Sequence, residues 1–205
     1  MGEFVPDLYW IPSNPGNDMP THTLQSQPST QPIIQRLTHV TEAQIEALAD
    51  VLIDCVEGGA SVSFMLPLAR EKALAFWRDV ADAVARGERA LMVSHDASGV
   101  INGTVQLILS QPDNQPHRAD LAKMLVHRRA RRQGLGDALM QAAQKLAREC
   151  GKTLLVLDTA SLEAERLYAR NGWTRLGAIP GYALLPQGGL CDTVYFYRLL
   201  TTSVN

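Results

Sequence analysis

The chain has 205 residues, of which 46% are hydrophobic and 20% charged, and this is enough for one domain with a sizeable core. Its 19 basic and 21 acidic residues give a net charge of −2, which argues against a protein that coats nucleic acid. No apolar run approaches the roughly 20 residues of a membrane span, and no signal peptide is recognisable. Three widely spaced cysteines fit neither a disulfide framework nor a zinc site, so we expect a cytoplasmic protein without a metal.

The first 32 residues differ in composition from the rest of the chain. They hold six of the 11 prolines, together with many Ser, Thr, Gln and Asn residues. Such a composition buries too little apolar surface to offset the loss of chain entropy. We therefore expect residues 1–32 to be a flexible tail, native or derived from cloning, and residues 33–205 to form a single domain.

From residue 33 onward the pattern is that of alternating strands and helices. Apolar residues spaced three to four apart predict amphipathic helices, and short apolar or alternating runs predict strands. The predicted helices are 41–57, with Thr41 as its N-cap, 70–87, 135–151 and 162–172. The predicted strands are 33–37, 89–96, 100–111, 119–127, 153–159, 172–179 and 192–200, with residues 180–189 as a loop. This order predicts a mixed α/β layer fold.

The segment Lys123–Leu139, KMLVHRRARRQGLGDAL, holds most of the chemical information. A strand ends near His127, four arginines follow, and Gly134 and Gly136 open a helix. Free backbone N–H groups at a helix start attract anions, glycines let a diphosphate approach closely, and arginines add charge-assisted bonds. The alternative is a run of basic residues that is only solvated at the surface. Such a run is not expected to lie directly before a glycine pair at a helix start. The segment therefore predicts a site for a phosphorylated ligand.

Two other phosphate-binding motifs are excluded by spacing. The P-loop pattern GxxxxGK[ST] is absent. A dinucleotide-binding turn fails because Leu139 occupies the third glycine position and residues 127–133 separate the strand from the first glycine. The unit also lies late in the chain, with no second parallel half after it.

The sequence Arg131-Arg132-Gln133-Gly134-Leu135-Gly136 after a strand resembles the acetyl-CoA signature R-x-x-G-x-G of the GNAT acetyltransferases. The helix ending LYARNGW is similar to the L-Y-x-x-x-G-F of that family, although Ser161 stands where the family often has Asn. The resemblance implies a single α/β domain. Its mixed, mostly antiparallel twisted sheet would have about seven strands, with a V-shaped splay between the fourth and fifth, and about four flanking helices.

The resemblance also implies where acetyl-CoA binds. Backbone groups around Met124, Leu125 and Val126 would contact the pantetheine arm and the thioester carbonyl. The amides of the loop and the helix start would hold the pyrophosphate. These residues are Arg131, Arg132, Gln133, Gly134, Leu135, Gly136 and Asp137.

Acetyl transfer to an amine needs a proton acceptor for the ammonium group and a proton donor for the leaving thiolate. Asp120 and Asp158 end up on neighbouring predicted strands, where two carboxylates can face one cleft. His117 and His127 are alternative bases by their ordinary pKa. By resemblance, Tyr168 occupies the position of the general acid beside the CoA sulfur.

The acceptor is expected to be a small molecule with a primary amine. The segment EGGASVSFM lies where GNAT enzymes build acceptor-binding loops, and the chain resembles the branch that inactivates toxins and antibiotics. Tabtoxin-resistance and kasugamycin-type aminoglycoside N-acetyltransferases are the examples. The candidate acceptor residues are Glu57, Ser63, Phe64, Trp77, Tyr182 and Asp192, with Asp120 and Asp158. Alternatives are a protein or peptide N-acetyltransferase, which would have an open groove, and a non-catalytic acyl-CoA-binding module. The apolar C-terminal strand is compatible with a homodimer, in which it would add to the sheet of a second copy. No nucleic-acid or membrane partner is expected.

Overall fold

The structure is a computed structural model that describes residues 32–200. The predicted tail, apart from its last residue, and the final five residues lie outside this range. The described chain contains four α-helices, one 3-10 turn and seven strands. They are β1 (Ile33–Leu37), α1 (Glu42–Glu57), α2 (Arg70–Ala85), β2 (Arg89–His95), β3 (Ile101–Ile108), β4 (Arg118–Val126), a 3-10 turn η1 (Arg128–Ala130), α3 (Leu135–Glu149), β5 (Leu154–Thr159), α4 (Leu162–Arg170), β6 (Thr174–Leu184) and β7 (Leu190–Leu199).

One seven-stranded sheet organises the described residues, in the order β1-β2-β3-β4-β5-β7-β6. All neighbouring strands pair antiparallel except β4 and β5, which are parallel. The parallel pair is where the chain crosses over through α3, as a parallel connection requires. The predicted mixed, mostly antiparallel sheet with four helices is thus confirmed.

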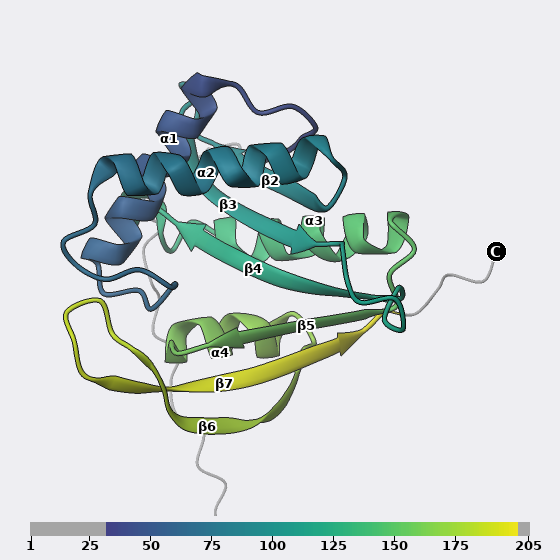
Figure 1. Ribbon diagram of the computed structural model, residues 1–205. Coiled ribbons are helices and arrows are strands. Elements are labelled where there is room, and N and C mark those ends of the chain that lie inside the picture. Colours follow the sequence, from purple (N-terminus) through teal and green to yellow (C-terminus); the bar gives the residue numbers. More distant parts are fainter. Residues whose placement is uncertain (1–31, 201–205) are drawn as a thin grey trace, which may run out of the picture. The chain divides into compact units, whose positions relative to one another are not determined.

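The helices cover both faces of the sheet in pairs (Figure 1). On one face α1 and α2 bury Leu48, Leu52 and Trp77 against residues of β1, β2 and β3. On the other face α3 and α4 bury Leu139 and Tyr168 against β2–β5 and β7. Burying an apolar side chain of this size stabilises the fold by roughly 1.5–3 kcal/mol each. Two separate cores therefore hold the sheet, one on each side.

Local sequence explains the helix starts. Thr41 forms the capping box of α1: its hydroxyl accepts from Gln44 N, and the Gln44 side chain accepts from Thr41 N. Ser161 caps α4 by accepting from Ala164 N at 3.3 Å. The serine at the position where GNAT proteins often carry asparagine thus has a structural role in this chain.

The expectation for the chain between β5 and the C-terminus needs one correction. Residues 180–184 belong to the predicted loop 180–189, but β6 continues through them to Leu184. The register with β7 shifts between Ile179 and Ala183, so Pro180 and Gly181 occupy an irregular section of an edge strand. Edge strands and bulges are the places where a sheet tolerates Pro.

Candidate active site

The site begins where β4 and β5 separate. Their parallel pairing covers only residues 118–120 of β4 and 154–156 of β5, although β4 runs on to Val126 and β5 to Thr159. Beyond Asp120 the two strands diverge, as Figure 1 shows. The predicted V-shaped splay is therefore present, and the backbone groups on the β5 side of β4 have no strand partner there.

A β-bulge in β4 changes which side chains face which side. Ala119 and Leu121 belong to the core beneath α3, whereas Leu125 belongs to the core beneath α1 and α2. The reversal occurs at Lys123, which has φ +50° and lies in the register shift opposite Thr104–Gln106. Bulges re-aim side chains in this way near functional sites.

The backbone of Val126 is turned toward the splay. The backbone N–H of His127 donates to Asn102 O at 2.9 Å, so the backbone N–H and C=O of His127 face β3. Because successive residues of a strand alternate in direction, the N–H of Val126 faces the opposite side, where β5 has diverged. The N–H of Met124 has the same orientation. Of the three residues predicted to contact the pantetheine arm, Met124 and Val126 thus present backbone groups to the gap, whereas Leu125 pairs with β3 and packs in the core beneath α1 and α2.

The start of α3 is an uncapped helix N-terminus. Its N-cap is Gly134, with φ +77°, and within the described residues no side chain accepts from the first N–H groups of the helix. The preceding Arg132 also has positive φ, +62°, so the loop turns sharply before the helix. Free N–H groups and the helix dipole together favour an anion here. Gly136 packs closely under α4, because a Cβ there would lie 3.2 Å from Leu167 Cδ2 and the Leu167 side chain would have to shift slightly.

The arginines of the loop have different surroundings. Arg128 is bound to α1: its backbone N and its Nε donate to the Asp54 carboxylate at 2.7 and 2.9 Å. Arg131 folds back, and its Nε donates to Val126 O at 3.1 Å. Arg129 and Arg132 are exposed and form no ion pair with the described residues. Arg128 therefore fixes the loop, and two exposed guanidinium groups remain for a phosphate.

Asp54 was missed by the sequence analysis, although it anchors the loop. Burial raises the pKa of its carboxyl, but the backbone and side-chain hydrogen bonds from Arg128 and the neighbouring charges outweigh burial, so the pKa is lowered. His127 Nδ1 lies 3.4 Å from the same carboxylate. The pKa of His127 is lowered, first by burial and then by the nearby arginines against the opposing effect of Asp54.

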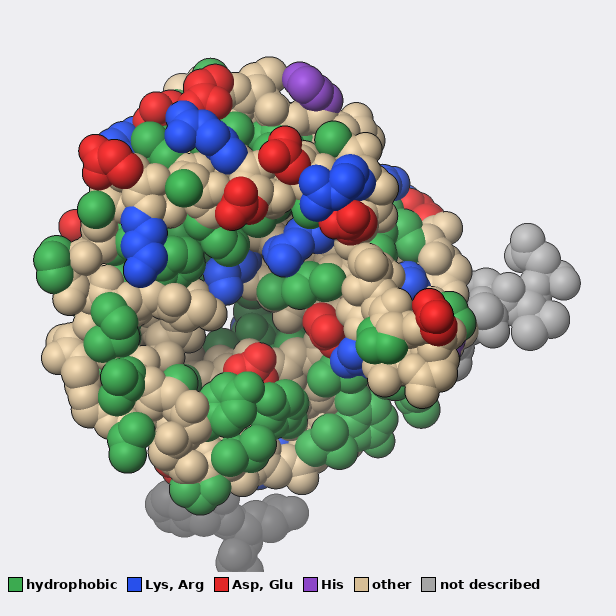
Figure 2. All heavy atoms as spheres, viewed as in Figure 1, with side chains coloured by type: hydrophobic (Ala, Val, Ile, Leu, Met, Phe, Trp, Pro, Cys, Tyr) green, Lys and Arg blue, Asp and Glu red, His purple; other side chains and the backbone are tan. Residues whose placement is uncertain are grey.

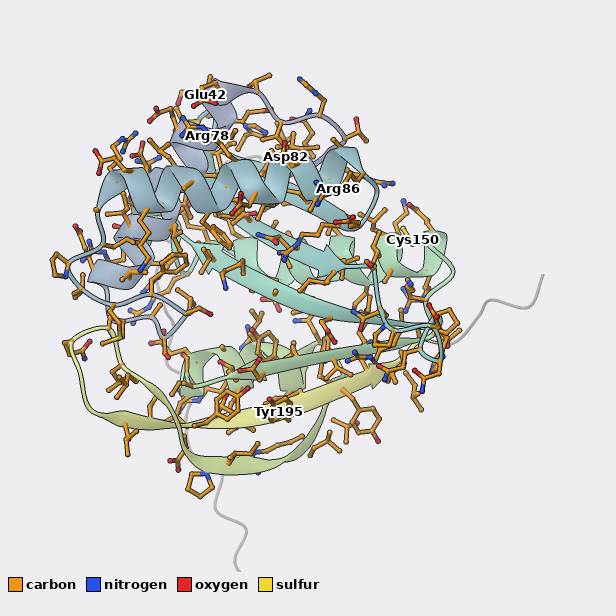
Figure 3. The ribbon with its side chains drawn as sticks, viewed as in Figure 1. Glu42, Arg78, Asp82, Arg86, Cys150 and Tyr195 are labelled. Atoms are coloured by element: carbon orange, nitrogen blue, oxygen red, sulfur yellow. The ribbon has the colours of Figure 1, made fainter. Side chains whose placement is uncertain are left out.

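Asp120, Asp158 and Tyr195 share one face of the sheet. Asp158 is opposite Tyr195 in the β5·β7 pair, and Asp120 is opposite Val156, which lies two residues before Asp158. Figure 3 shows Tyr195 on β7, beside β5. The hydrogen bond that Tyr195 donates to the Tyr182 hydroxyl at 3.0 Å, together with burial, raises the pKa of Tyr195 to about 12. Tyr195 was not predicted to be a site residue, although the alternation of side chains along the predicted strand DTVYFYRLL indicates which face of the sheet it occupies.

The two carboxylates have unequal partners. Asp120 is neutralised by Arg118, whose Nη1 lies 2.6 Å from Oδ1, and also accepts from Gln111 at 3.2 Å. Asp158 accepts a hydrogen bond from the Thr193 hydroxyl at 2.9 Å and forms no ion pair with the described residues. Asp158 is therefore the carboxylate that retains an unbalanced negative charge.

A cavity of about 300 Å³ lies beside Asp158. Its lining residues come from the α1–α2 loop, the end of β5 and the β6–β7 hairpin: Ser61, Ser63, Phe64, Met65, Asp158, Ala160, Tyr182, Ala183, Leu184 and Thr193. The loop and the hairpin are hydrogen-bonded to each other, from Ser61 Oγ to Leu184 O at 3.2 Å and from Leu66 N to Pro186 O at 2.8 Å. The cavity is thus closed on this side.

The structure brings three of the predicted acceptor residues, Ser63, Phe64 and Tyr182, to this cavity together with Asp158. Trp77 does not line it, because its helical position turns the side chain fully into the α1–α2 core.

The remaining candidates also lie elsewhere. Glu57 is directed to Arg128, with Oε2 3.5 Å from Nη2, and the Asp192 carboxylate accepts from Gly181 N at 2.9 Å. His117 is exposed at the start of β4, where β4 and β5 are still paired.

Tyr168 is buried on α4 and packs against Trp173 and Phe196 at centroid distances of 6.0 and 5.7 Å. Burial, and secondly the charge of Asp158, raise the pKa of its hydroxyl, so the group stays protonated at neutral pH. The Asp137 carboxylate accepts from Asn171 Nδ2 at 2.7 Å. That bond joins the start of α3 to the end of α4, so the helix that carries Tyr168 is fixed against the helix that carries the uncapped N-terminus.

These features fit a coenzyme that has a diphosphate at one end and a thioester on an amide-bearing arm. The open N-terminus of α3 suits the diphosphate, and the unpaired edge of β4 suits the arm. Within residues 32–200 no helix is long and apolar enough to cross a membrane.

Comparison with known proteins agrees with this geometry. The sequence profile described as "Acetyltransferase (GNAT) family" matches residues 60–173. An uncharacterised N-acetyltransferase from the hisH–hisA intergenic region of Azospirillum brasilense is 31% identical over 131 residues, which are 63% of this chain and 76% of that protein.

Two solved structures have the same fold. One is yncA, a putative acetyltransferase from Salmonella typhimurium with its cofactor acetyl-CoA, with 19% identity, a TM-score of 0.68 and coverage of 86% of this chain and 98% of that one. The other is a phosphinothricin acetyltransferase from Sinorhizobium meliloti in complex with AcCoA, with 14% identity, a TM-score of 0.69 and coverage of 82% and 88%. The chain belongs to the GNAT acetyltransferase family and is an acetyl-CoA-dependent N-acetyltransferase.

Proposed function

We propose that the chain transfers the acetyl group of acetyl-CoA to a primary amine of a small molecule, and that the acceptor is an antibiotic or toxin. The observation that carries the small-molecule part is the cavity of about 300 Å³ beside Asp158, which the α1–α2 loop and the β6–β7 hairpin bridge on one side. This volume lies at the lower end of the range for small-molecule sites. A protein or peptide acceptor would need an open groove, but the hydrogen bonds from the α1–α2 loop to the β6–β7 hairpin cover this path.

In this proposal the chain binds the coenzyme largely through its backbone. The first N–H groups of α3, with the side chains of Arg129 and Arg132, hold the pyrophosphate. The N–H groups of Met124 and Val126 hold the pantetheine arm and the thioester carbonyl at the unpaired edge of β4. Acetyl-CoA supplies the activated acyl group, so the protein's contribution is orientation and proton transfer.

Asp158 receives the acceptor's ammonium group and accepts its proton, directly or through a water molecule. An alkylammonium group has an ordinary pKa near 10, so it must lose a proton before its nitrogen can attack. Asp158 suits this role better than Asp120, because Arg118 already balances the charge of Asp120. The hydrogen bond from Thr193 fixes the carboxylate at the cavity wall.

Tyr168 protonates the leaving thiolate in this proposal. Its hydroxyl is kept neutral by burial, and its ring is fixed between Trp173 and Phe196. A proton donor at the sulfur prevents the thiolate from leaving as a free anion in a desolvated site.

The antibiotic or toxin branch draws support from the fold shared with the phosphinothricin acetyltransferase of Sinorhizobium meliloti. We also propose a cytoplasmic enzyme and a homodimer. The unpaired edge of β6 supports the dimer, because Leu176, Ile179 and Leu184 on this strand are exposed.

The test is a panel assay that follows the release of free CoA. Purified protein and acetyl-CoA are offered aminoglycosides, toxin-like and ordinary amino acids, and peptides with free N-termini. CoA release with small amines, and mass spectrometry of the acetylated product, would support the proposal. Release only with peptides would make it a peptide acetyltransferase. Binding of acetyl-CoA with no release for any amine would contradict the proposal.

A further inference from the structure

Lys123 is a cation with no counterion at the acceptor side of β4. Its side chain is partly buried, and among the described residues it forms neither a hydrogen bond nor an ion pair. Its Nζ lies over the ring of Phe76, 5.4 Å from the centroid. Enclosing a charged group without a partner is costly. Burial and the charge of Arg89 accordingly lower the pKa of Lys123, against an opposing effect of Asp158.

The backbone at Lys123 is also unusual. Its φ of +50° is in the left-handed region, which costs a residue with a Cβ roughly 1–2 kcal/mol. Glycine or asparagine would adopt this conformation more easily. Such strain persists where the surrounding structure holds it, often at functional sites. The bulge that causes the strain is also what re-aims the β4 side chains.

Two observations relate Lys123 to the acceptor cavity, although its side chain is not part of the cavity lining. Phe76, beneath its ammonium group, packs edge-on against Phe64 at 5.3 Å, and Phe64 lines the cavity. Asp158 also lines the cavity, and its negative charge opposes the lowering of the pKa of Lys123. The ammonium group therefore lies one aromatic ring away from the part of the cavity wall that Phe64 forms.

Arg89 supplies a second positive charge. Its Nη1 donates to Gln106 Oε1 at 2.7 Å, and the guanidinium forms no ion pair within residues 32–200. The remaining N–H groups of Arg89 are available to another acceptor. Figure 2 shows basic and acidic side chains gathered around one hollow on this face of the molecule. Charges of both signs are therefore present on this face of the molecule.

We propose that the acceptor is a zwitterion, an amine whose molecule also carries an acid group such as a carboxylate. Lys123, assisted by Arg89, binds the acid group, while Asp158 receives the amine. This inference rests on the proposed function and narrows its substrate class to amino-acid-like compounds. Polycationic amines without an acid group would place a positive charge against Lys123 and are excluded as good substrates.

A different explanation of Lys123 is that it only balances Asp158. No ion pair joins the two side chains, since no Lys123 nitrogen lies within 4.0 Å of a carboxylate in the described chain. The two explanations also differ in what they predict. A balancing charge affects every amine alike, whereas a charge that binds the acid group affects only acceptors that carry one.

The experiment offers each amino acid beside the amine that remains when its carboxylate is removed. The pairs are leucine and isoamylamine, phenylalanine and phenethylamine, and lysine and cadaverine. The wild type is compared with Lys123→Met, with the charge-conserving Lys123→Arg, and with Lys145→Met as the control. Lys145 is exposed on α3 and pairs only with Glu149 at 3.9 Å. Thermal melting checks that each variant is folded.

We expect the wild type to prefer at least one amino acid over its amine by about 100-fold in kcat/KM. Lys123→Met should lower kcat/KM for that amino acid about 10- to 100-fold and leave the amine within about threefold. Lys123→Arg should keep most of the preference, and Lys145→Met all of it. Calorimetric titration of the same compounds into the CoA-bound protein gives a second readout that does not depend on turnover.

Three outcomes separate the inference from the proposed function. If acetylation is observed but no amino acid is preferred or bound more tightly than its amine, the inference is wrong and the proposed function stands. If Lys123→Met weakens both members of a pair equally, Lys123 is a balancing charge and the inference is wrong. If binding depends on Lys123 and the carboxylate but no CoA is released, Lys123 still binds the acid group of a zwitterion, and the proposed function fails.

Discussion

Replacing Asp54 by alanine tests whether α1 positions the cofactor loop. The substitution removes the acceptor of two hydrogen bonds, from Arg128 N at 2.7 Å and from Arg128 Nε at 2.9 Å. Bonds to a charged group contribute about 1.5–3 kcal/mol each, and the half-exposed Arg128 side chain reduces the second contribution through solvent screening. We therefore expect a loss of about 2 kcal/mol in the free energy of unfolding. For a domain of this size this is a fall in Tm of about 4–8 °C.

The same substitution should weaken cofactor binding. Arg128 begins the loop that leads to the N-terminus of α3, so freeing it lets the loop adopt conformations in which the amides diverge. We expect the Kd for acetyl-CoA, measured by calorimetry, to rise about tenfold. The matched control is Asp50→Ala on the same helix, which breaks an exposed ion pair with Arg70 and should cost less than about 0.5 kcal/mol.

The pH dependence of this effect has a definite sign. The pKa of Asp54 is below its ordinary value of 3.8 in the folded protein, so the folded state favours the charged form. The stabilisation is complete above pH 3.8 and is lost as the pH falls through the lower folded pKa. The difference in stability between wild type and Asp54→Asn should thus persist from pH 7 to 5 and shrink only below about pH 4. A Tm within 1 °C of wild type at pH 7, with unchanged Kd, would refute the reasoning.

The remaining predictions concern the proposed catalytic groups and the β4 edge. Tyr168→Phe should lower kcat about 100-fold while the Kd for acetyl-CoA stays within twofold, and a loss smaller than threefold in steady-state assays would show that Tyr168 is only a core residue. Asp158→Asn keeps an acceptor for Thr193 and should lower kcat/KM for the amine at least about tenfold, whereas equal activity would assign the base elsewhere. Val126→Ala keeps the backbone N–H and should leave the Kd for acetyl-CoA within threefold; a larger change would mean that the side chain, not the amide, makes the contact.

The strand, loop and helix start that form the proposed cofactor half of the site could be predicted from sequence because they are one continuous segment. A strand, an arginine loop and a glycine-opened helix follow one another between Lys123 and Leu139, and their geometry follows from local rules. The positive φ of Arg132 and the left-handed Gly134 were not needed to locate the site.

The acceptor half was predicted less well because its residues meet across long stretches of chain. Ser61 and Leu184 are 123 residues apart in sequence, and Asp54 and Arg128 are 74 apart. Lys123 was missed because its orientation depends on a bulge that no local pattern predicts. Trp77 was assigned to the acceptor site although its place on the buried face of α2 makes it a core residue. Glu57 was assigned there although Arg128 is its partner.

The central claim is that the backbone amides at the start of α3 bind the diphosphate of acetyl-CoA. The most direct measurement is calorimetric titration of acetyl-CoA and of S-acetylpantetheine, which lacks the diphosphate, into the wild type and the double variant Gly134→Val/Gly136→Val. The account predicts that the wild type binds acetyl-CoA far more tightly than S-acetylpantetheine. It also predicts that the double variant loses about 100-fold in affinity for acetyl-CoA and keeps its affinity for S-acetylpantetheine. No measurable affinity of the wild type for acetyl-CoA, or full affinity in the double variant, would contradict it.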